Sequence, residues 1–164
     1  AIAADNDATW KARLMIETGR FPTAQAGTYW LRVVDKKFSR GKTYVIAENC
    51  MNGLQKPALA AMLRHELGGG TPAPYEPLFT SEWAFPIIAH GDESRTETVD
   101  IVGNLCCAAD VLAEDFTGPE LAVGDLIEVR NAGAYACTLT AQRFSSHQPP
   151  RELLVYGDGR VETE

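Results

Sequence analysis

The sequence predicts a mainly β fold with a few short helices, in which the sheet closes on itself or packs against a second sheet. Several short segments are rich in strand-forming residues, and each is bounded by Gly, Pro or Asp at a turn. A sheet of many short strands avoids exposed edges when it closes. The 164 residues, of which 45% are hydrophobic and 23% charged, are enough for one well-packed domain and few for two.

The first part of the chain contains two candidate elements. Residues 3–13 form either a short helix or an irregular chain start. Residues 13–17 are an apolar run that stops at Thr18-Gly19-Arg20, which suits a buried strand ending in a loop. Pro22 then allows a short helical turn, because proline is tolerated in the first turn of a helix.

A hairpin, a helix and a loop are expected next. Strand-forming residues at 29–33 and 44–46 flank the polar residues 39–42, which predicts a β-hairpin. The Ala-rich residues 57–65 have helical composition and are followed by three glycines. Three prolines predict a loop over residues 71–77.

The second half of the chain is expected to consist of short strands. Each candidate is bounded by turn residues, and a Gly124-Asp125 turn precedes one of them. The expected strands are residues 85–89, 97–103, 126–130, 135–141 and 152–156.

Charge and hydropathy argue against two classes of partner. The net charge of -7 gives an acidic surface that repels phosphate backbones, so no nucleic acid is expected. Apolar stretches such as residues 153–156 are far shorter than the roughly 18 residues that a membrane helix needs. Residues 1–10 lack the basic start and apolar core of an export signal, so a soluble, cytoplasmic protein is expected.

Neither the cysteines nor the histidines form a recognisable metal motif. No two cysteines have the C-x-x-C spacing, and a disulfide between adjacent cysteines would strain the peptide between them. We therefore expect free thiols, surface histidines and no metal. The residues concerned are Cys50, Cys106, Cys107, Cys137, His65, His90 and His147.

Three stretches carry residues suited to chemistry, and each also has a purely structural interpretation. The Glu17-Thr18-Gly19-Arg20 stretch follows a strand, where glycine lets backbone amides approach an anion, but it could equally be a turn with a surface ion pair. Between Gly103 and Asp110, the Cys106-Cys107 pair is either two buried small side chains or contains a thiol with a tuned pKa. Tyr135 is either a core aromatic or an exposed phenol that holds an anion.

Taken in order, these stretches resemble the fold-type III decarboxylases that use pyridoxal phosphate, the diaminopimelate/ornithine decarboxylase family. Residues 16–20 resemble its Glu-Pro-Gly-Arg element and are followed by similar segments at 26–29 and 32–37. Residues 52–59 resemble its Arg-Pro-Ala segment, and residues 103–110 its Gly-Pro-x-Cys-x-x-x-Asp element. Gly124-Asp125 and Gly133-Ala134-Tyr135 resemble its Gly-Asp and Gly-Ala-Tyr pair, so that the resemblance extends from Leu14 to Tyr156.

The resemblance implies a fold and a division of the chain. Residues 23–164 would form a C-terminal β-barrel domain similar to that of alanine racemase. Residues 1–22 would be a remnant of the end of an N-terminal β/α barrel, including its last strand.

The resemblance also implies a role for each matched residue. Glu17 would lie on the pyridine nitrogen of pyridoxal phosphate, where a carboxylate keeps that nitrogen protonated. Gly19 and Arg20 would hold the cofactor phosphate, unless Arg20 reaches the substrate instead. Cys106 would protonate the decarboxylated product across a dimer interface, and Tyr135 would contact the phosphate in the partner subunit's site.

Three departures from the family pattern bear on the substrate. Thr18 replaces a proline, which changes the stiffness of the loop and leaves its charge unchanged. Lys56 replaces an arginine that binds a substrate carboxylate, which keeps the charge and loses the bidentate fork. Cys107 replaces the Asp or Glu that pairs with the distal ammonium of basic substrates. We therefore expect a small amino-acid-derived substrate whose far end is not a free amine, such as one already joined to an acid in a siderophore or other specialised pathway.

The lysine that binds the cofactor covalently in this family lies on an early strand of the N-terminal barrel, and no lysine here has that context. We therefore expect the chain alone to be inactive. It would need a PLP-binding barrel, in the same gene product or a separate chain, within a homodimer or heteromer. The competing interpretation is a non-catalytic homologue that acts as a dimerisation module for a full-length decarboxylase.

Overall fold

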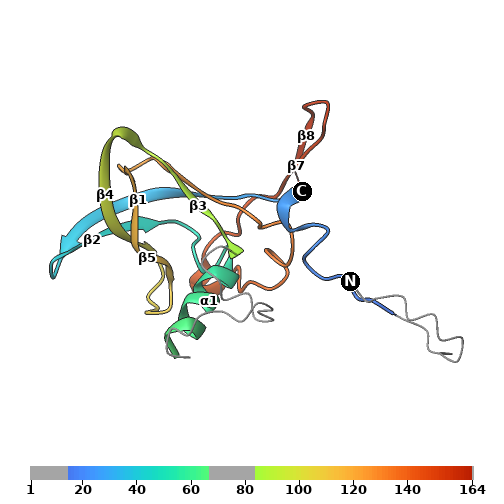
Figure 1. Cartoon of the computed structure of the whole chain (residues 1–164), viewed down its shortest axis with the longest axis horizontal. Coiled ribbons are helices and arrows are strands. Elements are labelled where there is room, and N and C mark those ends of the chain that lie inside the picture. Colours follow the sequence, from blue (N-terminus) through green and yellow to red (C-terminus); the bar gives the residue numbers. More distant parts are fainter. Residues whose placement is uncertain (1–14, 67–83, 164) are drawn as a thin grey trace, which may run out of the picture.

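Six strands form one strongly curved sheet in the computed structural model, which describes residues 15–66 and 84–163 (Figure 1). The strand order is β3-β6-β1-β2-β4-β5, and neighbouring strands are antiparallel except for the parallel pair β2 and β4. The edge strands β3 and β5 also approach each other, so the sheet is a nearly closed barrel. The strands are β1 (Tyr29–Ser39), β2 (Lys42–Ala47), β3 (Ile87–His90), β4 (Asp92–Gly103), β5 (Val111–Glu120) and β6 (Leu126–Val129). The predicted mainly β fold is confirmed.

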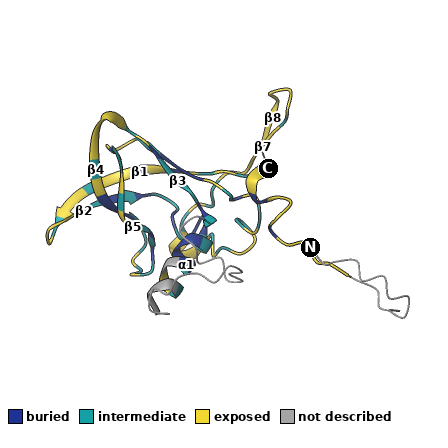
Figure 2. Cartoon of the chain, in the orientation of Figure 1, coloured by how far each residue is buried: buried dark blue, intermediate teal, exposed yellow. Residues whose placement is uncertain are grey.

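Alternation along β1 separates the inside of the barrel from its outside. Leu31 and Val33 are buried, whereas Trp30 and Arg32 face outward, because successive side chains of a strand point to opposite faces. Register shifts in the β1–β2 and β4–β5 pairs mark bulges, which let long strands bend around the core. The other buried residues that pack with this face include Val45, Ala47, Val99, Ile101, Ile127 and Val129 (Figure 2).

The helical elements lie outside the sheet. The predicted helix is confirmed as α1 (Gln55–Glu66), which contacts β5. Two short 3-10 turns, η1 (Ala24–Ala26) and η3 (Phe144–Ser146), flank the sheet in sequence, and η1 follows Pro22 as expected. No helix within the described ranges has the length and apolar composition needed to cross a membrane.

A separate two-stranded hairpin ends the described chain. It consists of β7 (Leu153–Val155) and β8 (Val161–Thr163), and it projects away from the curved sheet in Figure 1. The apolar side chains of both strands are exposed. An isolated two-stranded hairpin is marginally stable in water. Exposed apolar side chains on such a hairpin are typical of a surface that packs against another part of a protein.

Local expectations differ from the structure in several places. Residues 135–141 were predicted to be a strand but form turns, because Tyr135 has a φ of 61° and cannot continue a ladder. Residues 15–17 of the expected first strand are irregular and exposed, since no described segment pairs with them. The β5 strand was not predicted, because Gly118 and Pro119 are poor strand formers. The expected helix at 3–13 and loop at 71–77 lie outside the described residues.

Cysteines and histidines lie in different environments. None of the four thiols is paired in a disulfide: Cys50 is buried, Cys106 is exposed, and Cys107 and Cys137 are half-buried. His90 is exposed, as expected for a surface histidine, and His147 is half-buried. The side chain of His65 lies outside the described part of the structure.

Candidate functional site

Two chain segments far apart in sequence cross at one end of the barrel through a pair of glycines. The backbone N–H of Gly133 donates to the Ala24 carbonyl at 2.9 Å, and that of Ala132 donates to the Gly27 carbonyl at 2.9 Å. A Cβ on Gly133 would collide with the carbonyl oxygen of Thr23, and a Cβ on Gly27 would collide with Gly133 itself. Glycine at both positions is therefore what allows the segment after Arg20 to lie against the segment that carries Tyr135.

Arg20 is buried at this crossing, with a relative exposure of 9%. Its Cζ lies 5.0 Å from the ring centroid of Phe85 and 5.7 Å from that of Tyr135, so the guanidinium contacts both aromatic rings. Its Nη1 donates to the Asn131 carbonyl at 3.3 Å. Burial lowers the pKa of Arg20 from its ordinary value, and the neighbouring Tyr135 opposes this shift. An arginine remains charged under these conditions, so the crossing carries a fixed positive charge.

Tyr135 presents its hydroxyl to the surface beside Gly19. The side chain is 53% exposed, and a Cβ built on Gly19 would lie 3.4 Å from the Tyr135 Oη. The backbone at Tyr135 is left-handed, as it is at Asn131, whose Nδ2 donates to the Ala84 carbonyl at 3.0 Å. The turn thus aims the phenol outward. The structure brings Gly19, Arg20 and Tyr135 of one chain together, whereas the resemblance implied that Tyr135 would contribute to the partner subunit's site.

A buried carboxylate holds the loop that carries Cys106 and Cys107. Asp110 is 2% exposed, and its Oδ2 accepts the Leu105 N–H at 2.9 Å while its Oδ1 accepts the Met51 N–H at 2.7 Å. The Gly103 N–H closes the same loop by donating to the Asp110 carbonyl at 2.8 Å, and a Cβ on Gly103 would collide with the Asp110 carboxylate. The glycine and the aspartate of this motif are therefore structural, and they present Cys106 on an exposed loop.

The turn that Asp110 holds leads directly into α1, which carries Lys56. Leu54 N–H donates to the Cys50 carbonyl at 2.9 Å, and the first helical N–H, of Gln55, donates to the Thr140 hydroxyl at 3.2 Å. Residues 50–55 therefore touch both the Cys106 loop, through Asp110, and the segment after Tyr135, through Thr140. Lys56 is half-buried at this junction.

The predicted site residues thus fall into two groups on a shared framework. Gly19, Arg20 and Tyr135 are in mutual contact or close to it. Cys106, Cys107 and Lys56 lie on elements joined by Asp110, and no described contact links them to the first group. Glu17 is exposed on the irregular segment before Gly19.

Sequence reasoning missed the residues that support this site. Phe85 and Asn131, which hold Arg20, carry no sequence signal, because their contacts cross the chain. Asp110 was matched as part of a motif without a role, because its contacts with Met51 and Leu105 appear only in the structure. Among residues 15–66 and 84–163, no group of three or more His, Cys, Asp or Glu side chains is placed to hold a metal ion.

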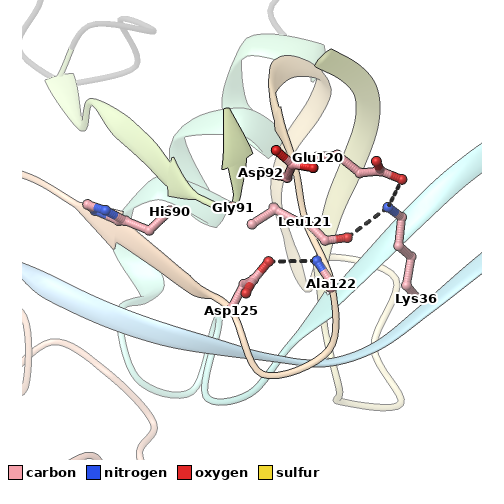
Figure 3. Close-up of a pocket in the computed structure, with 8 residues that line it drawn as sticks. All are labelled: Lys36, His90, Gly91, Asp92, Glu120, Leu121, Ala122 and Asp125. Carbon is pink, nitrogen blue, oxygen red and sulfur yellow. Dashed lines mark hydrogen bonds and ion pairs between the residues drawn. The ribbon is translucent and has the colours of Figure 1, made fainter. Parts of the chain in front are cut away.

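A separate cavity of about 590 Å³ lies at the bend between β3 and β4 (Figure 3). Its polar groups are engaged in holding the chain together. Lys36 Nζ lies 2.8 Å from Glu97 Oε2 and donates to the Leu121 carbonyl at 2.7 Å, and Asp125 accepts the Ala122 N–H at 2.8 Å. None of the predicted site residues lines this cavity, which we interpret as a structural joint between β5 and β6.

The fold and the match to known families define the class of this protein. Residues 15–133 match the family of pyridoxal-dependent decarboxylases in the part described as the C-terminal sheet domain. The match covers well over half of the chain, and the chain belongs to this family. Its cofactor is pyridoxal phosphate.

Individual relatives are consistent with this family. The chain is 31% identical over 140 residues to the L-glutamyl-(BtrI acyl-carrier protein) decarboxylase of Niallia circulans, covering 85% of the chain and 30% of the relative. It is 29% identical over 149 residues to the diaminopimelate decarboxylase of Zymomonas mobilis, covering 91% and 30%. The chain therefore spans about a third of the length of these relatives.

Solved structures show the same fold. A protein of Aquifex aeolicus superposes with a TM-score of 0.71 at 25% identity, over 94% of this chain and 33% of that protein. The diaminopimelate decarboxylase of M. jannaschii, solved with L-lysine, superposes with a TM-score of 0.67 at 24% identity, over 88% and 28%.

The crossing of Arg20 and Tyr135 fits the phosphate of this cofactor. Gly19 is exposed and has no side chain, so an anion can approach its backbone amide closely. The Tyr135 hydroxyl beside it is a second donor, and Arg20 adds a positive charge within 5.7 Å of the same ring. Two donors and one cation on an otherwise acidic chain match the chemistry of a phosphate.

Proposed function

We propose that this chain is the C-terminal portion of an enzyme that decarboxylates an amino acid with pyridoxal phosphate, and that it supplies cofactor and proton-donor residues to the active site. The observation that carries the proposal is the crossing that places Gly19, Arg20 and Tyr135 together, because these residues offer two hydrogen-bond donors and one cation to a phosphate.

In this proposal each residue acts at a defined atom. When bound, pyridoxal phosphate would supply an electron sink for the charge left on the α-carbon after loss of CO2. Glu17 holds a proton on the pyridine nitrogen of the cofactor, and Gly19, Arg20 and Tyr135 bind its phosphate. The Cys106 thiol delivers a proton to the α-carbon, and its exposure on a tied loop suits transfer to a site formed with another chain.

The remainder of the active site comes from outside residues 23–164, which form the β-barrel domain in this proposal, whereas residues 1–22 belong to the end of the PLP-binding barrel. That barrel supplies the lysine that binds the cofactor. Pairing of subunits, in a homodimer or a heteromer, places Cys106 at the partner's cofactor, whereas Tyr135 binds the phosphate beside Gly19 and Arg20 of its own chain. Such an enzyme acts on a small molecule in the cytoplasm.

The substrate is proposed to be an amino acid whose distal end is conjugated. Lys56 and Cys107 stand at the substrate-binding positions, and Cys107 offers no charge to pair with a distal ammonium. The Niallia circulans relative is named for an L-glutamyl group carried on a protein, which supports a conjugated substrate and a specialised pathway for this chain.

The test is to express the chain together with its PLP-binding barrel and to measure the absorbance of bound cofactor and the release of CO2. Cys106→Ala is expected to lower turnover by about 10²- to 10⁴-fold, the range for loss of a proton donor, and to leave cofactor absorbance unchanged. Cys137→Ala, a half-buried thiol beside Glu152, is the matched control and should retain turnover.

Two results would contradict the proposal. Cofactor absorbance from the chain without any barrel would show that the lysine is not missing. A stable complex with the barrel that binds cofactor but releases no CO2 from free or conjugated amino acids would favour the dimerisation module instead. The cluster of phosphate-binding groups argues against that module, because a purely structural partner does not need Tyr135 and Gly19 side by side.

A further inference from the structure

A second cavity, of about 410 Å³, lies beside the Cys106 loop. One wall is the loop itself, including Cys107, and the other is the tip of the β1–β2 hairpin with Lys37, Arg40 and Tyr44. Cys107 therefore faces a space bounded by two cationic residues, whereas Cys106 is not part of its lining.

The two cations of this cavity are not neutralised by the described structure. Lys37 Nζ lies 5.9 Å from the Tyr44 ring centroid, and no carboxylate of residues 15–66 and 84–163 pairs with Lys37 or with Arg40. Asp110 also lines the cavity, but it is 2% exposed and already accepts two backbone N–H groups.

A neighbouring lysine on the same hairpin differs from these two cations. Lys42, on the same hairpin, is held by Asp100 at 3.0 Å and by Asp115 at 3.1 Å. Lys36, Arg95 and Arg160, in other parts of the described structure, are also paired with carboxylates. Two unpaired cations around one cavity form a local positive field in an acidic protein.

We propose that this cavity binds an anionic group, a carboxylate or a phosphoryl group, carried on the distal end of the substrate. The inference rests on the proposed function, because it assigns the distal end of that substrate to the Cys107 side of the loop. Lys37 and Arg40 attract the anion, and the Tyr44 hydroxyl is an additional donor on the same wall. A carboxylate at position 107 would repel such a group, and a neutral thiol does not.

The cavity can be tested by alkylation of Cys107 without any turnover. The protein is treated in parallel with iodoacetate, which is anionic, and iodoacetamide, which is neutral, and modification of each cysteine is followed by peptide mass spectrometry. Because both reagents react with the same thiol, the ratio of their two rates does not depend on the intrinsic reactivity of that thiol. The ratio therefore reports the electrostatic potential at the thiol. Cys137 is the internal reference, because the Glu152 carboxylate lies beside it.

At low salt, the ratio of iodoacetate to iodoacetamide at Cys107 is expected to be roughly fivefold higher than at Cys137, and to fall in high salt. Lys37→Gln combined with Arg40→Gln should lower the ratio at Cys107 several-fold, toward that of Cys137. Arg95→Gln combined with Arg160→Gln changes the net charge equally at paired surface sites and should leave it unchanged.

Competition separates the two sources of the anion. Protection of Cys107 by inorganic phosphate but not by succinate indicates a phosphoryl group, and the reverse indicates a carboxylate; either result supports the proposal. Equal ratios at Cys107 and Cys137, no response to the double variant, or a Cys107 that reacts with neither reagent would overturn it. Since labelling requires no CO2 release, these outcomes are independent of whether the decarboxylase proposal succeeds.

Discussion

Replacing Asp110 tests how the loop that presents Cys106 is held in place. Its carboxylate accepts one N–H from Leu105, at 2.9 Å, and one from Met51, at 2.7 Å, and it is 2% exposed. Asp110→Asn keeps one acceptor oxygen and turns an amide N–H₂ toward the other backbone donor. Asp110→Ala removes both acceptors and leaves two buried N–H groups without partners.

The magnitude follows from these two bonds. A hydrogen bond to a charged acceptor contributes about 1.5–3 kcal/mol, so Asp110→Asn should cost about that amount and Asp110→Ala about twice as much. A loss of 1.5–3 kcal/mol corresponds to a roughly 10- to 150-fold larger population of the open loop, and hence to faster amide exchange there. Hydrogen–deuterium exchange at the Met51 and Leu105 amides measures this opening directly.

Asp115→Asn is the matched control. Asp115 lies on the strand that follows the loop, but its side chain is 72% exposed and pairs with Lys42 at 3.1 Å. An exposed ion pair contributes less than about 1 kcal/mol, so exchange at the two loop amides should stay within a few-fold of wild type. If Asp110→Asn left the Met51 and Leu105 amides as protected as in wild type, the carboxylate would not be what holds the loop.

Three further predictions concern the framework. Gly133→Ala should lower the free energy of unfolding by about 2–3 kcal/mol in urea unfolding, because the new Cβ collides with the Thr23 carbonyl. An unchanged urea midpoint would show that the two segments do not pack closely at Gly133. Thr140→Val should cost about 1–2 kcal/mol and speed exchange of the Gln55 amide, which loses its acceptor. The pKa of Glu128 is lowered, first by the guanidinium that donates to it, so its stabilisation is present at pH 7 and lost as the pH falls below about 4.5. In urea unfolding, Glu128→Gln should therefore have a lower free energy of unfolding than wild type at pH 7. The difference between the two proteins should shrink toward pH 3.

Patterns that depend on neighbouring residues predicted their elements well. The β1–β2 hairpin and α1 follow from short-range signals, namely a polar turn between strand formers and an Ala-rich segment. Strand β5 was missed because its sequence contains Gly118 and Pro119, and it forms because β4 supplies a long antiparallel partner. Pairing with a neighbour overrides weak local propensity.

Residues 135–141 show the opposite error, because a strand was predicted there and the structure has none. Its composition suits a strand, but the left-handed backbone at Tyr135 and the contact between Thr140 and the start of α1 turn it into a series of turns. The contacts that decide this conformation come from residues more than 80 positions away, and no local pattern contains them.

By itself the sequence determined the family, the β-rich class and the identity of Gly19, Arg20, Cys106 and Tyr135 as residues to examine, because ordered motifs and periodicity are written along the chain. Only the tertiary structure decided that Arg20 is buried between Phe85 and Tyr135, and that Cys107 faces two unpaired cations. Burial and electrostatic potential at a residue are sums over groups brought close by folding, and these groups are distant in sequence.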